Sequence, residues 1–276
     1  MPVSSKRPSG FSTFRAGGKI AAMVFASVLL MPLQWVVQRF TNGRATSVLP
    51  RLWFRCLRAA MGIRVDVVGT PREGGGTVFV GNHVSHFDIL VLGSLLRARF
   101  IAKDDMERWP GMRFIGELGQ TLFISRKRSD AANVAASLSA KMQAGQDLVL
   151  FPEGTTSSGE QVAPFKSSLF SLFIDKDGTG AAWTLQPFTL DVVSVDGHAL
   201  SAGADRDIYA FHGGMDAGAH VKRFLRLSGA LVRVVFHPPV TVTPDTDRKA
   251  LAARLHAVVA SGLRGEAAAA STASPS

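Results

Sequence analysis

The stretch TVFVGNHVSHFD at residues 77–88 decides how this chain folds. Residues 77–80 form a short apolar run with β-branched side chains, which predicts a buried strand. The polar residues that follow lead into a helix expected at residues 85–96. Polar side chains at the end of a strand and the start of a helix occupy the position where α/β sheets present their sites.

Short apolar runs alternate with helical segments on both sides of this stretch. Such alternation is typical of an α/β fold, and we expect a mixed sheet covered by helices. The predicted strands are 64–68, 77–80, 99–102, 121–124, 147–151, 184–190 and 231–236, and the predicted helices are 85–96, 129–144, 167–174 and 245–263.

The charge of the chain is concentrated at its N-terminal end. The 276 residues carry a net charge of +10, and residues 1–70 hold ten Lys or Arg against one acid, Asp66. Strongly basic chains usually meet nucleic acid, anionic membranes or anionic substrates. A single tyrosine and an uncharged apolar run do not make a base-stacking groove, so no nucleic-acid partner is expected.

An apolar run at residues 20–37 is interrupted only by Ser27, Pro32 and Gln34. As a helix it would be about 27 Å long, at the lower limit for a hydrocarbon core of about 30 Å. A cleaved signal peptide is the alternative, which the lack of a small-residue cleavage pattern after the run disfavours. The single cysteine, Cys56, cannot form an internal disulfide, so nothing indicates an oxidising compartment.

Residues 48–61 predict an amphipathic helix. Arg51, Arg55 and Arg58 share one face. The other face carries Leu52, Trp53, Leu57 and Ala60, a pattern typical of helices in a membrane interface. The alternative is a basic surface helix packed on the domain. We expect residues 1–62 to be membrane-anchoring helices, 63–264 the domain that carries the site, and 265–276 a disordered tail.

His83 is the residue that local structure does not explain. Ser85 and Asp88 fit a capping box, which gives both a structural role. Asp88 can also fold back onto the imidazole of His83, and such a pair prepares the other ring nitrogen to act as a base. From these residues alone, a catalytic histidine and a hydrogen-bonded structural histidine stay equal alternatives.

A metal site made of His83, His86 and Asp88 is a third interpretation. It is disfavoured because the remaining candidate ligands His212, His220 and His237 are isolated in the sequence.

Asn82 and His83 with Asp88 resemble the first motif of the glycerolipid acyltransferase family, which includes 1-acylglycerol-3-phosphate O-acyltransferase. Three later segments are similar to the family's other motifs and follow in its order. They are GQTLFISR at 119–126, FPEGT at 151–155 and LQP at 185–187. The resemblance covers about residues 60–240, and it makes 63–264 an acyltransferase domain.

The resemblance implies direct acyl transfer to a lipid hydroxyl from a thioester of acyl-carrier protein or coenzyme A, without a metal or other cofactor. It makes His83 the general base and Asp88 the residue that orients it. A positioned base contributes about 10²–10⁴-fold to such a reaction. Ser85 as an acylated nucleophile is disfavoured by its capping position, and the chain has no G-x-S-x-G elbow.

The resemblance also implies an acceptor site. Arg126 would meet an anionic headgroup, and Lys166 would add a headgroup contact. Glu153, with Gly154 and Thr155, would position the acceptor. The structural alternatives are a solvated basic turn at 126–128 and a cap for the polar loop at 155–159.

One departure from the family bears on the acceptor. Thr156 stands where the family usually has an arginine, so one cation expected against a phosphate is missing. The segments 151–157, 165–169, 209–211 and 236–239 resemble the bacterial lyso-ornithine lipid O-acyltransferase branch. An amino-acid headgroup carries a carboxylate and an ammonium and needs fewer cations than a phosphomonoester. We expect lyso-ornithine lipid as the acceptor, with lysophosphatidic acid as the alternative.

The expected place of action is the cytoplasmic face of the bacterial inner membrane, with a monotopic or single-pass anchor. The partners are membrane lipids, the acyl carrier and the lyso-lipid. A non-catalytic membrane-binding module and a metallohydrolase are the rival functions. The sequence leaves the acyl-chain length, the donor carrier, the depth of the anchor and the oligomeric state open.

Overall fold

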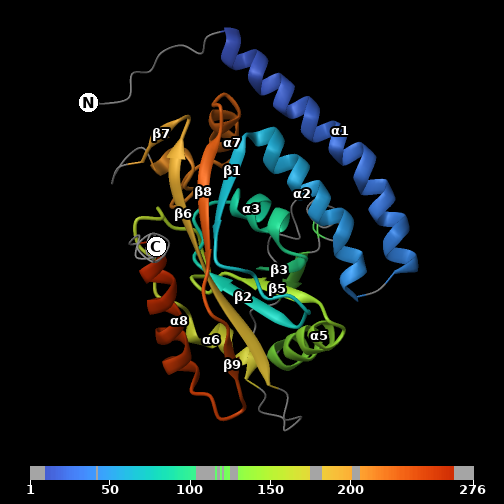
Figure 1. The fold of residues 1–276 in the computed structure, drawn as a ribbon, viewed down its shortest axis with the longest axis vertical. Helices are drawn as coiled ribbons and strands as arrows, with labels where there is room; N and C mark the ends of the chain where they lie inside the picture. Colours follow the sequence, from blue (N-terminus) through green and yellow to red (C-terminus); the bar gives the residue numbers. More distant parts are fainter. Residues whose placement is uncertain are drawn as a thin grey trace, which may run out of the picture.

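A computed structural model describes residues 10–41, 43–103, 121–124, 130–174, 182–200 and 206–263, together with Gly116 and Gly119. These residues form helices around one mixed sheet, and the expected α/β class is confirmed (Figure 1). The expected tail at 265–276 and the expected site residue Arg126 lie outside the described residues.

The described strands pair in the order β1-β8-β6-β2-β5-β3-β4, with β7 and β9 on β6. Strands β2, β5, β3 and β4 run parallel to their neighbours, as do β2 and β6, whereas β6 and β8 are antiparallel. The bounds are β1 Ile63–Val68, β2 Thr77–Gly81, β3 Ala98–Lys103, β4 Thr121–Ile124, β5 Asp147–Leu150, β6 Trp183–Val195, β7 His198–Ala199, β8 Ala230–Phe236 and β9 Val240–Val242.

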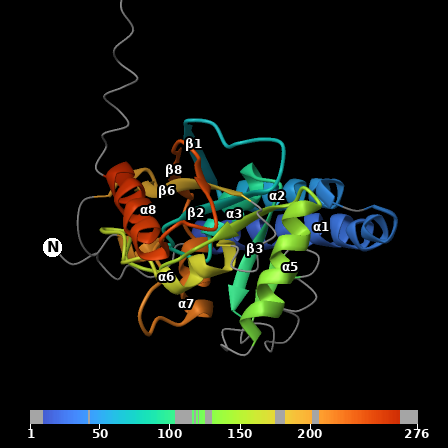
Figure 2. The same ribbon diagram turned by 90° about the horizontal axis from the view of Figure 1, so that it is seen from below.

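Helices cover both faces of the sheet, which buries every residue of the central strand β2. Phe79 of β2 points into one core, with side chains of α2 (Val48–Met61), α3 (Asp88–Leu95) and α7 (Ala217–Leu225). Val78 and Val80 point into the other core, with side chains of α5 (Ala131–Gln143), α6 (Ser167–Phe170) and α8 (Arg248–Leu263). Figure 2 shows α8 and α2 on opposite sides of the molecule.

Three short 3₁₀ helices complete the described elements: η1 Gly43–Ser47, η4 Ser171–Phe173 and η5 Arg206–Ile208. The helix expected at 167–174 is divided between α6 and η4, and the helix expected from residue 245 begins at Arg248. Strand β6 is longer than expected because β2 and β9 pair with its first half, whereas β8 pairs with it from Phe188 to Val195.

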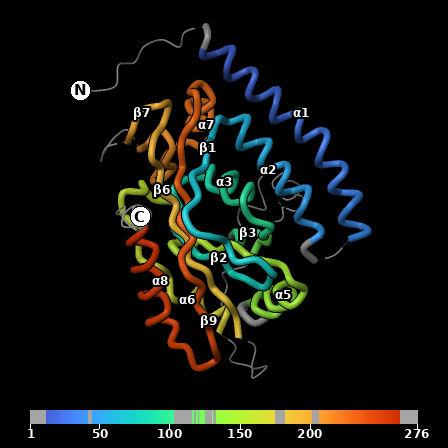
Figure 3. The backbone as a smooth tube through the Cα atoms, viewed as in Figure 1, coloured from blue at the N-terminus to red at the C-terminus, as the bar shows by residue number. Residues whose placement is uncertain are grey.

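Helix α1 (Gly10–Phe40) lies along α2, as Figure 3 shows. Three side-chain hydrogen bonds hold it there: Lys19 Nζ to the Met61 carbonyl at 2.6 Å, Trp53 Nε1 to Ser27 Oγ at 2.9 Å, and Gln34 Nε2 to the Thr46 carbonyl at 3.0 Å. One face of α1 is therefore docked on the body of the protein.

The outer face of α1 is apolar and exposed. Its segment Ser12–Phe40 is long and apolar enough to cross a membrane; an 18-residue window within it has a mean hydropathy of 2.1, and only 17% of that window is buried. The exposed large apolar side chains of α1 are Phe14, Ile20, Val24, Phe25, Val28, Leu29, Leu33, Trp35, Val36 and Phe40.

The apolar face of α2 packs into the body rather than outward. Trp53 and Leu57 are buried, and the ring of Phe54 lies against Gly93 of α3. The expectation that Trp53 and Leu57 lie in a membrane interface is therefore wrong, because α1 and α3 cover them. Residues 48–61 form the alternative, a basic helix packed on the domain, whereas Leu52 stays exposed.

Candidate functional site

The loop between β2 and α3 brings His83 and Asp88 together. His83 Nδ1 lies 2.9 Å from Asp88 Oδ2, which also accepts the N–H groups of Val84 at 2.7 Å and Ser85 at 2.9 Å. Asp88 is fully buried, whereas the His83 side chain is 17% exposed. The expected contact between the two side chains is confirmed.

This arrangement settles which nitrogen of His83 is basic. The Asp88 oxygen is an acceptor, so Nδ1 carries the proton and Nε2 keeps its lone pair. The carboxylate cannot turn away, because two backbone N–H groups hold the same oxygen. The loop therefore fixes the orientation of the imidazole, with Nδ1 toward Asp88.

The expected capping box is present only in part. The Ser85 N–H meets the Asp88 carboxylate, but Ser85 Oγ accepts from the N–H of Phe87, at 3.4 Å. Helix α3 begins at Asp88 instead of at Ser85. The physical reason is that residues 83–85 wrap around the Asp88 carboxylate, which leaves their backbone outside the helix.

Tyr209 also belongs to this cluster. From the sequence it appeared only within the segment 209–211 that resembles the family branch, and no role was predicted for it. Its hydroxyl donates to Asp88 Oδ1 at 3.3 Å. Complete burial raises the pKa of Tyr209 well above its ordinary value, and the Asp88 charge raises it further, so the hydroxyl keeps its proton. No spacing signal could have linked two residues that are 121 positions apart.

Strand β5 brings the FPEGT segment next to His83, because β5 pairs in parallel with β2. Phe151, directly after β5, stacks on the His83 ring with the centroids 3.9 Å apart and the planes 11° from parallel. The aromatic face restricts the rotation of the imidazole. The first and third motifs thus meet at the carboxyl ends of neighbouring strands.

Glu153 is buried and bonded to the loop that carries His83. Its Oε1 accepts the N–H of His83 at 2.7 Å and its Oε2 accepts the N–H of Ala163 at 2.9 Å. It is 2% exposed, and burial raises its pKa while the two backbone bonds oppose that rise. Each oxygen thus accepts a backbone N–H, which matches the alternative, a cap for the polar loop; the part expected for Glu153 in positioning the acceptor stays a prediction.

Gly154, Thr155 and Lys166 lie beside this loop. Gly154 has a φ of +72°, and a Cβ there would be 2.7 Å from Lys166 Nζ, so the ammonium lies against the glycine backbone. Thr155 and Lys166 have exposed side chains. These residues present a hydroxyl and a cation at the surface next to the third motif.

Asn82 and Gln186 hold the strands around the site. The Asn82 amide donates to the Leu190 carbonyl at 2.9 Å and accepts the Leu190 N–H at 2.7 Å. Gln186, in the fourth motif, donates to the carbonyls of Thr70 and His237. Both side chains are buried; Asn82 ties β6 to the loop that carries His83, and Gln186 ties β6 to the segment before β2 and to His237.

His86 lies outside the His83–Asp88 pair. Its ring is 5.1 Å from the rings of Phe211 and His220, measured between centroids. Burial lowers the pKa of His86 to about 4, with a further lowering by His220, so the ring is neutral near pH 7. Among the described residues no group of three or more His, Cys, Asp or Glu side chains is spaced to hold a metal ion.

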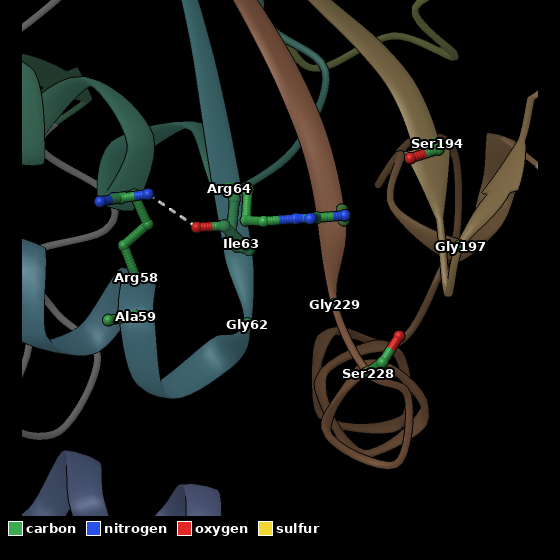
Figure 4. A pocket seen from close by; sticks show the side chains of 10 residues that line it. Arg58, Ala59, Gly62, Ile63, Arg64, Ser194, Gly197, Ser228 and Gly229 are labelled. Carbon is green, nitrogen blue, oxygen red and sulfur yellow. Dashed lines mark hydrogen bonds between the residues drawn. The ribbon is translucent and has the colours of Figure 1, made fainter.

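A separate cavity of about 510 Å³ lies where β1 and β8 begin. Figure 4 shows Arg58 and Arg64 on either side of β1 at its edge. The Arg58 Nη1 atom donates to the Ile63 carbonyl at 2.7 Å. None of the expected site residues lines this cavity, so the His83 loop and the cavity are different places in the molecule.

A buried carboxylate that orients a histidine at the carboxyl end of a central strand is an arrangement suited to general-base catalysis. Comparison with known proteins agrees: the Acyltransferase family model matches residues 64–190. A lyso-ornithine lipid O-acyltransferase from Brucella abortus is 34% identical over 253 residues, which is 89% of this chain and 94% of that protein. The chain belongs to the acyltransferase family and is an enzyme that acylates lyso-lipids.

Two further proteins are similar to this chain, one over part of its sequence and one in its fold. A 1-acyl-sn-glycerol-3-phosphate acyltransferase from Neisseria meningitidis is 35% identical over 123 residues, covering 44% of this chain and 48% of that protein. The crystal structure of the 1-acyl-sn-glycerophosphate (LPA) acyltransferase PlsC from Thermotoga maritima matches with a TM-score of 0.61, at 16% identity, over 96% of this chain and all of that one. The structural match supports the fold.

Proposed function

We propose that this enzyme acylates the hydroxyl of lyso-ornithine lipid, with His83 as the general base and Asp88 as the residue that orients it. The observation that carries the proposal is the 2.9 Å contact between His83 Nδ1 and Asp88 Oδ2, which leaves Nε2 free to accept a proton. An alcohol is a weak nucleophile near pH 7, so a positioned base is what the reaction requires.

The proposed step is balanced as follows. His83 Nε2 takes the proton of the acceptor hydroxyl as the oxygen attacks the thioester carbonyl. The tetrahedral intermediate then breaks its carbon–sulfur bond, and the imidazolium returns the proton to the leaving thiolate. Asp88 stabilises the imidazolium between the two steps. The products are an ester and the free thiol of acyl-carrier protein or coenzyme A.

Two observations support lyso-ornithine lipid as the acceptor. The similarity to the Brucella abortus enzyme extends over 89% of the chain, whereas that to the Neisseria meningitidis enzyme covers 44%. Thr156 stands in place of the arginine expected for a phosphate headgroup. Lys166 and Thr155 remain as surface groups for the acceptor, and Arg126 stays in the proposal on the resemblance alone.

The exposed apolar face of α1 supports membrane attachment, and its docking favours a monotopic helix. Moving α1 through a bilayer would carry α2 with it, because Lys19 and Ser27 bond α1 to α2 and Gln34 bonds it to η1, which leads directly into α2. Burying an arginine of α2 at the bilayer centre would cost about 3 kcal/mol. We place the enzyme on the cytoplasmic face of the bacterial inner membrane, where soluble acyl thioesters reach it.

The test supplies purified enzyme with an acyl-carrier-protein thioester and either lyso-ornithine lipid or lysophosphatidic acid. We expect acylated ornithine lipid as the main product, and a rate about 10²–10⁴-fold lower with His83→Ala. Product from lysophosphatidic acid alone would establish the alternative acceptor. Full activity of His83→Ala would refute the proposed base, and inhibition by a chelator would favour a metallohydrolase.

A further inference from the structure

Asp191 is a partly buried acid that follows the residue bonded to Asn82, at the start of the His83 loop. It follows Leu190, whose N–H and carbonyl are both bonded to Asn82, the residue before His83. Its neighbour across the strands is Arg233, but the Arg233 Nε donates to Asp66 at 3.0 Å. Asp191 makes no hydrogen bond or ion pair within the described part of the chain.

Arg206 is an incompletely satisfied cation on the other side of the same region. Its Nη1 donates to the Gly159 carbonyl at 3.0 Å, whereas its Nε is buried and has no hydrogen-bond partner among the described residues. A buried polar atom without a partner costs folding free energy unless a ligand or water satisfies it.

The loop of residues 157–159, which bonds to Arg206, also contacts the His83 loop. A Cβ at Gly159 would lie 2.9 Å from Val84 Cγ1, and the Ser157 N–H donates to the His83 carbonyl at 2.9 Å. Asp191 therefore follows Leu190, the residue that Asn82 contacts. Arg206 is bonded to Gly159, in the loop of residues 157–159 that contacts residues 83 and 84.

Asp191 and Arg206 influence each other without forming an ion pair. Burial raises the pKa of Asp191, and the nearby charge of Arg206, followed by that of Arg233, lowers it. Nevertheless no nitrogen of either arginine lies within 4.0 Å of the Asp191 carboxylate. A carboxylate and a guanidinium that are held apart complement a molecule that carries both an ammonium and a carboxylate.

We propose that Asp191 and Arg206 form a subsite for a zwitterionic amino-acid headgroup, with the ammonium at Asp191 and the carboxylate at Arg206. This inference rests on the proposed acylation of lyso-ornithine lipid and identifies the residues that distinguish its headgroup. Asp191 repels a phosphomonoester, which carries only negative charge. The subsite thus explains how a chain with Thr156 selects its acceptor without a second cation at that position.

The test compares Asp191→Asn and Arg206→Gln with wild type in the full-length enzyme. With lyso-ornithine lipid we expect KM to rise at least about tenfold and kcat to change less than about threefold, because the headgroup contact is lost and the base is intact. With lysophosphatidic acid, KM should stay constant or fall for Asp191→Asn. Arg206→Lys should recover part of the loss. Asp245→Asn and Arg254→Gln make the same changes at exposed residues and serve as matched controls.

A binding measurement separates this inference from the proposed reaction. Nα-octanoyl-ornithine carries both charges and lacks the hydroxyl, so its affinity does not depend on catalysis. We expect calorimetric binding to wild type and at least about tenfold weaker binding to either variant. Equal binding to all forms, no binding, or equal KM changes for both acceptors would overturn the subsite. Selective binding by a wild type that acylates neither lipid would retain the subsite and refute the proposed reaction.

Discussion

At the residue scale, the Asp88 carboxylate is held by donors on both oxygens. Oδ2 accepts from the backbone and faces His83, and Oδ1 accepts from Tyr209. The backbone bonds determine where the carboxylate lies, whereas the tyrosine changes how strongly it attracts the imidazolium. A substitution at Tyr209 therefore changes the strength with which Asp88 attracts the imidazolium and leaves the position of the Asp88 carboxylate the same.

Tyr209→Phe should lower kcat by at most about tenfold, because Oδ1 loses a donor that helps to orient the carboxylate while the backbone N–H groups keep Oδ2 in place. The pH profile of kcat/KM should move to higher pH, because an Asp88 that lacks this donor holds the imidazolium more tightly. Steady-state kinetics across pH measure both effects. Wild-type kcat with an unmoved profile would show that Tyr209 only fills space.

His86 predicts a pH dependence of stability. Burial lowers its pKa to about 4 in the folded protein, against 6.5 as the ordinary value. Between these values the unfolded chain binds more protons than the folded one, so the free energy of unfolding rises with pH across this window. The full effect is roughly 3 kcal/mol.

His86→Phe should therefore flatten the rise in unfolding free energy between about pH 4 and 6.5. Urea denaturation at several pH values measures it. Parallel curves for the variant and wild type would contradict a buried, neutral His86.

At the element scale, α2 belongs to the core although its arginines resemble those of an interfacial helix. Phe54 is 5% exposed and makes an edge contact with Phe100 at 5.9 Å. Arg51 and Arg55 donate to the Ser94 carbonyl near the end of α3. These bonds satisfy a carbonyl at a helix C-terminus, where positive charge is favourable.

Phe54→Ala should lower the free energy of unfolding by about 3–5 kcal/mol, because it leaves a cavity between α2 and α3. Leu52→Ala, on the exposed side of the same helix, is the matched control and should cost less than about 1 kcal/mol. Chemical denaturation measures both. Similar small losses for the two variants would show that α2 is not part of the cooperative core.

At the scale of the whole molecule, the apolar outer face of α1 and the His83 loop have separate tasks. Phe25 and Val28 are 71% and 70% exposed, which no internal packing explains. Contiguous exposed apolar side chains mark surfaces that contact a membrane or another protein. The proposed membrane attachment can therefore be removed without touching the chemistry.

Phe25→Asp with Val28→Asp should reduce sedimentation with anionic vesicles at least about tenfold, because apolar burial is replaced by charge repulsion. Activity on vesicle-borne lyso-lipid should fall in parallel, while kcat/KM for a soluble short-chain lyso-lipid stays within about twofold. Val67→Asp, at an exposed apolar residue of β1, is the control. Unchanged sedimentation would assign membrane binding to another surface.

Much of this molecule could be predicted from local sequence. The strands near residues 64–68, 77–80 and 147–151 follow from short apolar runs, and the α/β class follows from their alternation with helices. The contact of His83 with Asp88 was also predictable, because the two residues are five positions apart and one loop joins them. Apolar composition alone identified α1 as the exposed helix that a membrane could cover.

Other features depend on contacts between distant parts of the chain. Strand order places β8 between β1 and β6, and it joins Asp191 to the region of Arg233. Tyr209 reaches Asp88 across 121 positions, and Glu153 reaches His83 across 70. The direction of the apolar face of α2 likewise depended on what covered it, since burial in a core and burial in a membrane select the same side chains.

The sequence by itself determined the fold class, the histidine with its carboxylate, and the position of the basic and apolar N-terminal region. Periodicity and short loops contain that information, because they act within a few residues. Only the tertiary structure decided that Glu153 supports the loop, that Tyr209 completes the cluster, and that Asp191 and Arg206 form no ion pair with each other within the described residues. Those facts depend on which strands become neighbours, and strand pairing is a property of the whole sheet.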